Sequence, residues 1–443
     1  MDQTPLFSLP PSEPAPTTEP TRPEHARIVR PNRQQLAWMA RDLDAALPQD
    51  HPARAIWDLL ERLDLSAFYR SIRAVIDGPG RPTTDPKVLL ALWLLATTEG
   101  IGSARRLARL CDEHDAYRWL AGGVPINYHM LADFRVGQQA ALDRLLTDII
   151  GALLHSGAVT LERVAQDGMR VRASAGTASF RRRDTLQGCL RAARAQVERV
   201  AEAPDDAEIT QRQEAARVRA ARGRLARVEE ALARLPALEQ SKDVQQRHAT
   251  RDKRARIGEA RASTSDPDAR VMKMPDGGFR PAYNVQFATD GAHHVIVGVA
   301  VTNGSDGGQA GPVAEQVAAR TGAVPCAYLV DGGFATRGDV TALERLGTTV
   351  YAPVRAPRLR SDEARHTPRH GDTAEVAAWR GRMATEDAKR IYRDRGAIAE
   401  WTNAQARAHG LLQFNVRGLA NAMSVALLVA VTHNVQRWLR LPT

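Results

Sequence analysis

Residues 391–414 read IYRDRGAIAEWTNAQARAHGLLQF, a run without proline that is rich in alanine, arginine and glutamine. Residues that would share one face of a helix recur in this run at steps of three and four. They are Ile391, Ile398, Trp401, Gln405, Ala408 and Leu412. Such spacing predicts a helix with one partly buried face.

Three charged residues on this predicted helix are spaced seven apart: Arg393, Glu400 and Arg407. Two helical turns separate each pair, so the three side chains are expected on nearly one stripe. A carboxylate between two guanidinium groups suits a site where a metal ion and a phosphate meet, because the carboxylate binds the cation and the arginines bind phosphate oxygens. The alternative is a solvated helix with ordinary charge pairs, and the helix alone favours that alternative.

The composition indicates a basic protein with a polyanionic partner. The chain has 443 residues, enough for two or three domains, with 61 Lys and Arg against 51 Asp and Glu. Much of the positive excess lies from Arg355 onward. A basic surface points first to nucleic acid and second to an anionic membrane. The three cysteines are widely spaced, which fits neither a disulfide framework nor a zinc site and suits a reducing cytosol.

Targeting signals are not visible in the sequence. Residues 1–23 are rich in Pro, Thr and Glu instead of being apolar, as a signal peptide would be. The longest apolar run, 423–431, is too short to span a bilayer. We therefore expect a soluble cytoplasmic protein, associated with the nucleoid and without a membrane partner.

Hydrophobic periodicity divides the chain into four parts. Residues 1–30 are punctuated by proline and predict a disordered tail, and residues 31–155 predict an all-helical N-terminal domain. This helical domain either binds DNA through its arginines or is a bundle with a charged exterior. Residues 184–261 show two heptad patterns around a proline-containing break, which predicts a coiled-coil-like helical hairpin. Residues 156–183 and 262–443 alternate strand and helix patterns, which predicts an α/β catalytic domain with a mixed sheet around the inserted hairpin.

Three acids lie at the ends or middles of elements in the predicted α/β domain. Asp167 lies within a strand pattern at 164–172, Asp331 ends the apolar strand pattern 326–331 just before two glycines, and Glu400 lies on the helix described above. Ligand sites in α/β sheets form outside the carboxyl ends of strands. We therefore expect the three carboxylates to converge at one sheet edge and to bind two Mg²⁺ or Mn²⁺ ions. Two such ions can activate a water or a 3′-hydroxyl on a phosphodiester.

Other Asp-Gly pairs in the chain are interpreted as turns, because this dipeptide is far more often a turn than a ligand. They begin at Asp276, Asp290 and Asp306. The run Arg181, Arg182 and Arg183, which follows the first strand pattern, is interpreted as a phosphate contact, so DNA binding should fall steeply with salt.

Several blocks together carry a family resemblance. They are the span 81–135 with RWLAGG and ADFR, AQDGMRVRASAG around Asp167, STSDPDARVMK at 263–273, RPAYNVQFATDGAHHVIV, YLVDGGF around Asp331, and Tyr392-x2-Arg395-x4-Glu400-x6-Arg407 followed by Arg417-Gly418. In these blocks the chain resembles the DDE transposases of bacterial insertion sequences, and is most similar to the IS1182 group within the broad IS4/IS5-like set. The resemblance covers roughly residues 32–440.

The resemblance implies an RNase H-like catalytic domain interrupted by a helical insertion, with Asp167, Asp331 and Glu400 as the DDE triad and metal ligands. Tyr392 and Arg395 match positions of the family signature, and Arg407 stands where that signature usually has Lys. Together with Arg393, these residues are expected to support DNA binding. The block 266–270 also matches, and we interpret it as a turn in preference to a DNA-positioning element.

The function that the resemblance implies is metal-dependent cleavage of double-stranded DNA at inverted-repeat ends and joining of the 3′-hydroxyls to target DNA. Two ends must be held together, so a homodimer or larger assembly on DNA is expected. Two alternatives remain open. One is a transposon-derived DNA-binding protein without catalysis, which the complete triad disfavours, and the other is a metal-dependent nuclease without strand transfer.

Overall fold

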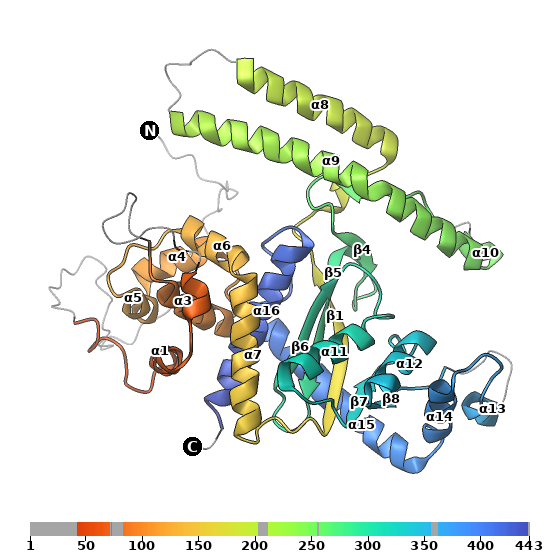
Figure 1. Ribbon diagram of the computed structural model, residues 1–443. Coiled ribbons are helices and arrows are strands. Elements are labelled where there is room, and N and C mark those ends of the chain that lie inside the picture. The colour runs from red at the N-terminus through yellow and green to blue at the C-terminus, as the bar shows by residue number, and fades with distance from the viewer. Residues whose placement is uncertain are drawn as a thin grey trace, which may run out of the picture. The chain divides into compact units, whose positions relative to one another are not determined.

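The computed structural model describes residues 42–70, 72, 83–202, 211–254, 257–355 and 362–441. The predicted tail at 1–30 lies outside these residues, as does the proline break at 204–206. The described residues from Leu43 onward belong to one compact unit (Figure 1).

Helices occupy the first part of this unit. They are α1 (Pro52–Arg62), α2 (Ser66–Tyr69), α3 (Pro86–Thr98), α4 (Ala104–Glu113), α5 (Asp115–Ala121), α6 (Tyr128–Gly137) and α7 (Gln139–His155). Their starts follow from local sequence: Pro86 opens α3, and the Asp85 side chain before it accepts a hydrogen bond from the Lys87 backbone N–H. Helix α3 is buried almost all round, as expected for a helix with few polar residues.

A six-stranded mixed sheet forms the centre of the rest. Its strands are β1 (Arg163–Arg172), β4 (Arg270–Lys273), β5 (Phe279–Asp290), β6 (Ile296–Thr302), β7 (Ala327–Val330) and β8 (Thr349–Tyr351). The order is β4-β5-β1-β7-β8, and β6 also pairs with β5. Strand β1 is antiparallel to β5 and parallel to β7, which is parallel to β8. The predicted strand pattern at 164–172 and the β5–β6 hairpin are both present.

Helices cover both faces of the sheet (Figure 1). Helices α11 (Ala310–Thr321) and α12 (Arg337–Leu346) lie in front of it in this view, and α15 (Glu386–Ala408) lies behind. The short helices α13 (Asp362–His366) and α14 (Ala374–Arg382) precede α15. Helix α15 differs from the predicted helix at 391–414: it begins five residues earlier, after the capping side chain of Thr385, and ends before Leu412, which is exposed.

The last helix, α16 (Leu419–Trp438), joins the helical part to the sheet. It packs against both α7 and β6, and its buried Asn434 side chain bonds both backbone groups of Ile296. One continuous hydrophobic core therefore contains residues of α1 to α7 and of the sheet. By length and composition α16 is the described helix that could cross a membrane, and two thirds of its apolar window is buried inside the protein, as in a core helix.

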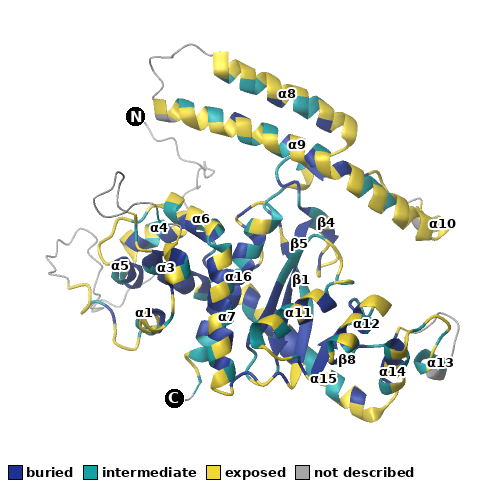
Figure 2. Cartoon of the chain, in the orientation of Figure 1, coloured by how far each residue is buried: buried dark blue, intermediate teal, exposed yellow. Residues whose placement is uncertain are grey.

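The hairpin between 184 and 261 consists of α8 (Arg183–Glu202), α9 (Gln211–His248) and the short α10 (Arg251–Arg254). Most of its residues are exposed (Figure 2). It has a small core of its own, formed by Leu186, Ala231, Leu235, Ala260 and Ala262. At its base, β2 (Phe180–Arg181) pairs with β3 (Ala262–Ser263), so the chain leaves and re-enters at one two-stranded ribbon.

Candidate active site

Two of the predicted acids, Asp167 and Asp331, lie on neighbouring parallel strands. Gln166 of β1 stands opposite Val330 of β7, and Asp167 and Asp331 are the next residues of the two segments. This pairing places both acids at the carboxyl edge of β7, where the sequence predicted a site.

Backbone and side-chain donors orient both carboxylates. Asp331 Oδ1 accepts hydrogen bonds from the backbone N–H groups of Gly333 (2.6 Å) and Phe334 (3.3 Å). Asp167 Oδ1 accepts from the Gly168 N–H at 2.9 Å, and its Oδ2 accepts from Asn403 Nδ2 of α15 at 3.1 Å. The two acids are therefore held in place by the loop after β7 and by α15.

Burial raises the pKa of Asp167 to about 6; the Arg395 guanidinium opposes this rise, and the negative charge of Asp331 adds to it. The Asp167 side chain is only 20% exposed. A buried carboxylate beside a second carboxylate is a place where a cation lowers the electrostatic free energy.

The third predicted acid, Glu400, contacts this pair through an arginine. Arg395 Nη1 lies 3.7 Å from Asp167 Oδ2, and Arg395 Nη2 lies 3.8 Å from Glu400 Oε1. Arg395 is 16% exposed, whereas the Glu400 side chain is 72% exposed. The Tyr392 side chain forms a hydrogen bond with the Arg395 guanidinium, and burial raises the pKa of Tyr392. The structure thus brings Tyr392 and Arg395 to the acids.

The three residues of the predicted stripe, Arg393, Glu400 and Arg407, all lie on the described helix α15 without forming ion pairs with one another. All three residues are exposed, and among the described residues neither Arg393 nor Arg407 makes an ion pair with Glu400. The reason is the direction of helical side chains, which lean toward the helix N-terminus. The Glu400 carboxylate lies over the preceding turn, where a Cβ on Gly396 would be 3.7 Å from its Oε1, and it meets Arg395 there.

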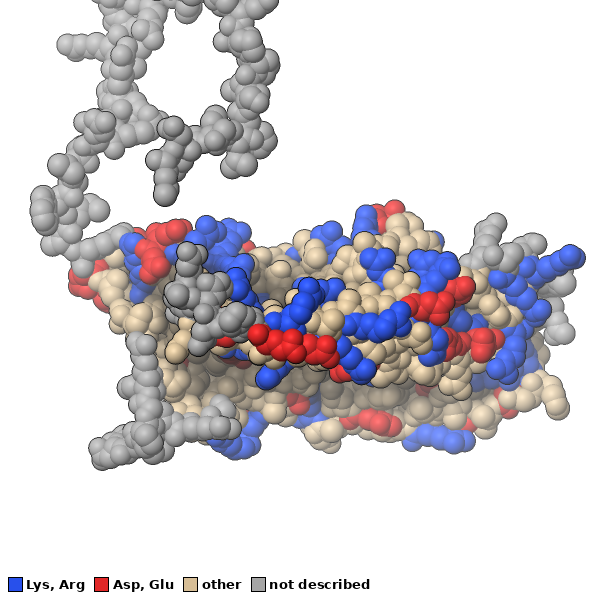
Figure 3. Space-filling model, turned by 90° about the horizontal axis from the view of Figure 1, so that it is seen from above, with Lys and Arg blue, Asp and Glu red and all other residues tan. Residues whose placement is uncertain are grey.

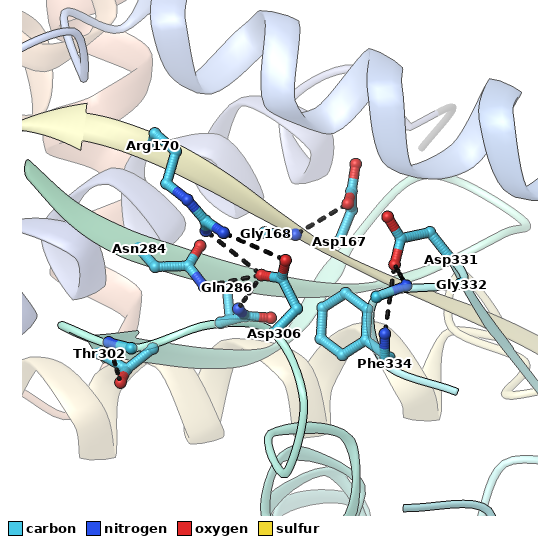
Figure 4. A network of polar contacts seen from close by, with 12 residues as sticks. Asp167, Gly168, Arg170, Asn284, Gln286, Thr302, Asp306, Asp331, Gly332 and Phe334 are labelled. Atoms are coloured by element: carbon cyan, nitrogen blue, oxygen red, sulfur yellow. Dashed lines mark hydrogen bonds and ion pairs between the residues drawn. The ribbon is translucent and has the colours of Figure 1, made fainter. Parts of the chain in front are cut away.

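A fourth acid, Asp306, lies beside the pair (Figure 4). Its carboxylate accepts hydrogen bonds from Arg170 (3.2 and 3.3 Å), Asn284 (2.7 Å) and Gln286 (3.0 Å). A Cβ on Gly168 would lie only 2.4 Å from Asp306 Oδ1, so the network closes against the backbone next to Asp167. Asp306-Gly307 is a turn, as interpreted, since the Asp306 carbonyl accepts from the Gln309 N–H at 3.2 Å, and the Asp306 side chain in addition forms this network. The sequence signal for this network is the alternation of two polar residues, Asn284 and Gln286, in β5. Both are fully buried.

The other Asp-Gly pairs agree with their interpretation as turns. Asp276 accepts from the Gly278 N–H in the turn between β4 and β5. Asp290 accepts from Ala292 in the β5–β6 turn, and it also accepts from the Leu161 N–H at 2.8 Å.

The arginine run at 181–183 lies at the base of the hairpin. Arg182 pairs with Glu259 at 2.9 Å and Arg183 with Glu239 at 2.6 Å, whereas Arg181 is exposed on β2. Two of the three guanidinium groups are thus already paired with acids, and a phosphate contact by this run stays a prediction.

The block 266–270 is a turn, as interpreted, and it also caps α16. Buried Asp266 accepts from the Tyr283 hydroxyl at 2.7 Å and from the Gly418 N–H at 3.1 Å. Asp268 accepts from the Leu419 N–H at 3.0 Å and pairs with Arg234 of α9 at 2.8 Å. Acids suit a helix N-terminus because its free N–H groups carry partial positive charge.

The fit of a divalent cation to the site is partial. Asp167 and Asp331 supply the hard oxygen donors that Mg²⁺ and Mn²⁺ prefer, and burial, with the charge of Asp331 adding to it, raises the pKa of Asp167. Among the described residues, however, no three His, Cys, Asp or Glu side chains gather closely enough to hold a metal ion. The third predicted ligand, Glu400, has its carboxylate 3.8 Å from Arg395 Nη2.

Comparison with known families gives two matches. Residues 41–136 match a model described as Transposase domain (DUF772), and residues 253–435 match a model described as Transposase DDE domain. The second match contains Asp331, Glu400 and Asp306, while Asp167 lies before it. No curated protein matches the chain, and no solved structure does.

Proposed function

We propose, for a chain whose two family matches indicate a DDE transposase, that it cuts double-stranded DNA at the ends of an insertion sequence and joins the 3′-hydroxyls to target DNA. Proteins with this DDE domain generally use divalent metal ions. The observation that carries the proposal is the placement of Asp167 and Asp331 side by side on parallel strands, with Arg395 connecting Asp167 to Glu400.

The sheet supports an RNase H-like catalytic domain. In such a domain the first strand lies at the centre of the sheet, antiparallel to one neighbour and parallel to the other, as β1 is to β5 and β7. On this proposal the helices before residue 156 are the N-terminal domain and the hairpin is an insertion. The IS1182 group stays the proposed subgroup.

Asp167, Asp331 and Glu400 are the proposed catalytic acids and would hold the metal. When bound, the Mg²⁺ or Mn²⁺ ions supply Lewis acidity that activates a water or 3′-hydroxyl and stabilises the leaving oxygen of the phosphodiester. Asn403 orients Asp167 by donating to its Oδ2, and the Gly333 and Phe334 N–H groups orient Asp331.

Arg395 positions the acids in the absence of substrate, because it contacts both Asp167 and Glu400. Its forked donors also suit a phosphate oxygen of the DNA. Arg393 and Arg407, on the exposed side of α15, and the run 181–183 are also proposed to contact DNA, although they do not contact the acids.

The test uses purified full-length protein, labelled transposon ends, a supercoiled target and Mg²⁺. The Asp331→Asn variant is expected to lose cleavage and joining while binding of the ends stays nearly intact, because only the metal donor is changed. Asp276→Asn is the matched control, since Asp276 is also followed by glycine but lies in an exposed turn. Full activity of Asp331→Asn would contradict the assignment.

The same assay separates the alternatives. Cut ends without joined products would indicate a nuclease, and bound ends without cuts in the wild type would indicate a DNA-binding protein.

We further propose that the active form is a dimer or larger assembly on DNA, acting in the cytoplasm at the nucleoid. The hairpin is one candidate interface, and a clamp on DNA is the other. If a variant lacking 184–261 still pairs two ends in a gel-shift assay, the hairpin is not the interface.

A further inference from the structure

A cleft of about 930 Å³ lies between helix α9 of the hairpin and the edge strand β4. One wall is the part of α9 that follows Pro236, with Leu238, Ser241 and Lys242. The proline removes a backbone hydrogen bond within α9 at the start of this wall. The opposite wall is β4, with Val271 and Lys273, and the loop at 303–305 closes one side.

The lining of this cleft is cationic and its free charges are of one sign. Among the described residues, Lys242, Arg261 and Lys273 form no ion pair. The one acid in the lining, Glu259, is already paired with Arg182. The lining therefore offers several cations and no unpaired carboxylate to an incoming ligand.

The outer face of the hairpin differs from the cleft. Seen from above, blue and red side chains are mixed over α8 and α9 (Figure 3). Some of the hairpin's charges form pairs, for example Arg194 of α8 with Glu229 of α9 at 3.4 Å. The paired charges there attract a polyanion less than the unpaired cations of the cleft do.

Apolar side chains lie among the cations. Val271 is 44% exposed on β4, and Leu238 and Met272 line the cleft beside it. A cationic groove with apolar or aromatic surface between the charges is the lining that binds single-stranded nucleic acid, since phosphates meet the charges and base faces meet the apolar surface.

The size of the cleft distinguishes a single strand from a duplex. A volume of about 930 Å³ lies at the upper end of ligand pockets, which span about 300–1,000 Å³. It admits a few nucleotides of an extended strand. A duplex adds a second backbone and two grooves, about 12 Å and about 6 Å wide, and so needs much more room than this volume offers.

The cleft ends against the candidate active site. Arg170 lines it, and the same guanidinium pairs with Asp306. The Asp306 carboxylate in turn lies within contact distance of positions 168 and 333, next to Asp167 and Asp331. A strand lying in the cleft is therefore led toward the two acids.

We propose that this cleft binds a single strand of DNA adjoining the cut, with its phosphates at Lys242, Arg261 and Lys273. The proposal rests on the proposed function in that the strand comes from DNA held at the acids. The hairpin then has a role in holding substrate besides any role in pairing subunits.

The test measures binding of the full chain to a labelled single strand and to the matching duplex, by fluorescence anisotropy at several salt concentrations without divalent metal. The double variant Lys242→Gln/Lys273→Gln removes two phosphate contacts. For the single strand, the negative slope of log K against log salt is expected to become less steep by about 1.4, since each contact contributes about 0.7. The slope for the duplex is expected to stay at the wild-type value.

The matched control is Arg217→Gln/Arg219→Gln, which makes the same charge change at exposed positions of α9 before Pro236. It is expected to bind the single strand like the wild type. An unchanged single-strand slope in the lysine variant, or an equal loss for strand and duplex, would overturn the proposal.

Asp167→Asn separates this proposal from the proposed function. It is expected to bind the single strand normally while cleavage is lost. If the wild type does not cleave but the lysine variant still loses its single-strand slope, the proposed function fails and the cleft site stands.

Discussion

Replacing Gly168 by alanine is a sharp test of how the network beside Asp167 is packed. A Cβ at this position would lie 2.4 Å from Asp306 Oδ1, 2.7 Å from Asn284 Oδ1 and 2.8 Å from Gln286 Nε2. These distances are too short for real Cβ contacts, so the Asp306 carboxylate must move. Its bonds to Arg170 are already 3.2 and 3.3 Å long and would be lost first.

Overpacking of a core costs about 1–3 kcal/mol, and a buried polar group left without a partner costs about 1–3 kcal/mol. We therefore expect Gly168→Ala to lower the free energy of unfolding by about 2–6 kcal/mol, and to lower cleavage because Asp167 is the preceding residue. Urea unfolding followed by tryptophan fluorescence measures the first effect, and the cleavage assay the second.

The control is Gly151→Ala in α7, where a Cβ would meet nothing within 4 Å. Alanine is the better helix former, so this variant is expected to gain about 0.5–1 kcal/mol. A Gly168→Ala variant that unfolds at the wild-type urea concentration would refute the packing argument, whatever its activity.

Three further predictions concern stability. Burial lowers the pKa of His433 to about 3 from its ordinary 6.5, so the stability it contributes is present above 6.5 and is lost as the pH falls below that value. Between pH 7 and pH 5 the free energy of unfolding of the wild type should fall by about 2 kcal/mol more than that of His433→Gln. An equal fall in the two proteins would argue against this role of His433. Asp266→Ala leaves a buried hydroxyl and a helix N-terminal N–H without their acceptor, so urea unfolding should show a loss of about 2–4 kcal/mol, against almost none for Asp276→Ala. Leu235→Ala in the hairpin core should remove about 2–5 kcal/mol of local stability, seen in hydrogen exchange as faster exchange in α8 and α9 but not in β1; equal loss in β1 would show one shared cooperative unit.

Periodicity and spacing predicted the sheet, the hairpin and the neighbouring positions of Asp167 and Asp331. These features depend on local patterns: an apolar strand ends on Asp331, and two heptad stretches flank a break. The sequence predicted a helix at 391–414, but α15 begins and ends earlier. Thr385 caps its start, and the chain turns at Gly410, where φ is positive.

The site was predicted less completely, for two physical reasons. Asp306 obtains its role from Arg170, which is 136 residues away in the chain, and from two strand residues about 20 away. An Asp-Gly dipeptide carries no local sign of such partners. A spacing of seven marks one stripe of a helix, yet the long side chains of Glu400 and Arg395 meet at a spacing of five, because the Glu400 side chain leans over the preceding turn.

The ribbon of β2 and β3 has an evolutionary consequence. Because Phe180 stands opposite Ser263 and Arg181 opposite Ala262, the chain departs and returns at adjoining points. An insert attached in this way can lengthen, shorten or be exchanged between descendants without shifting the register of β1 against β5. If the insert binds substrate as proposed, its contacts can therefore diversify while the proposed catalytic acids stay in place.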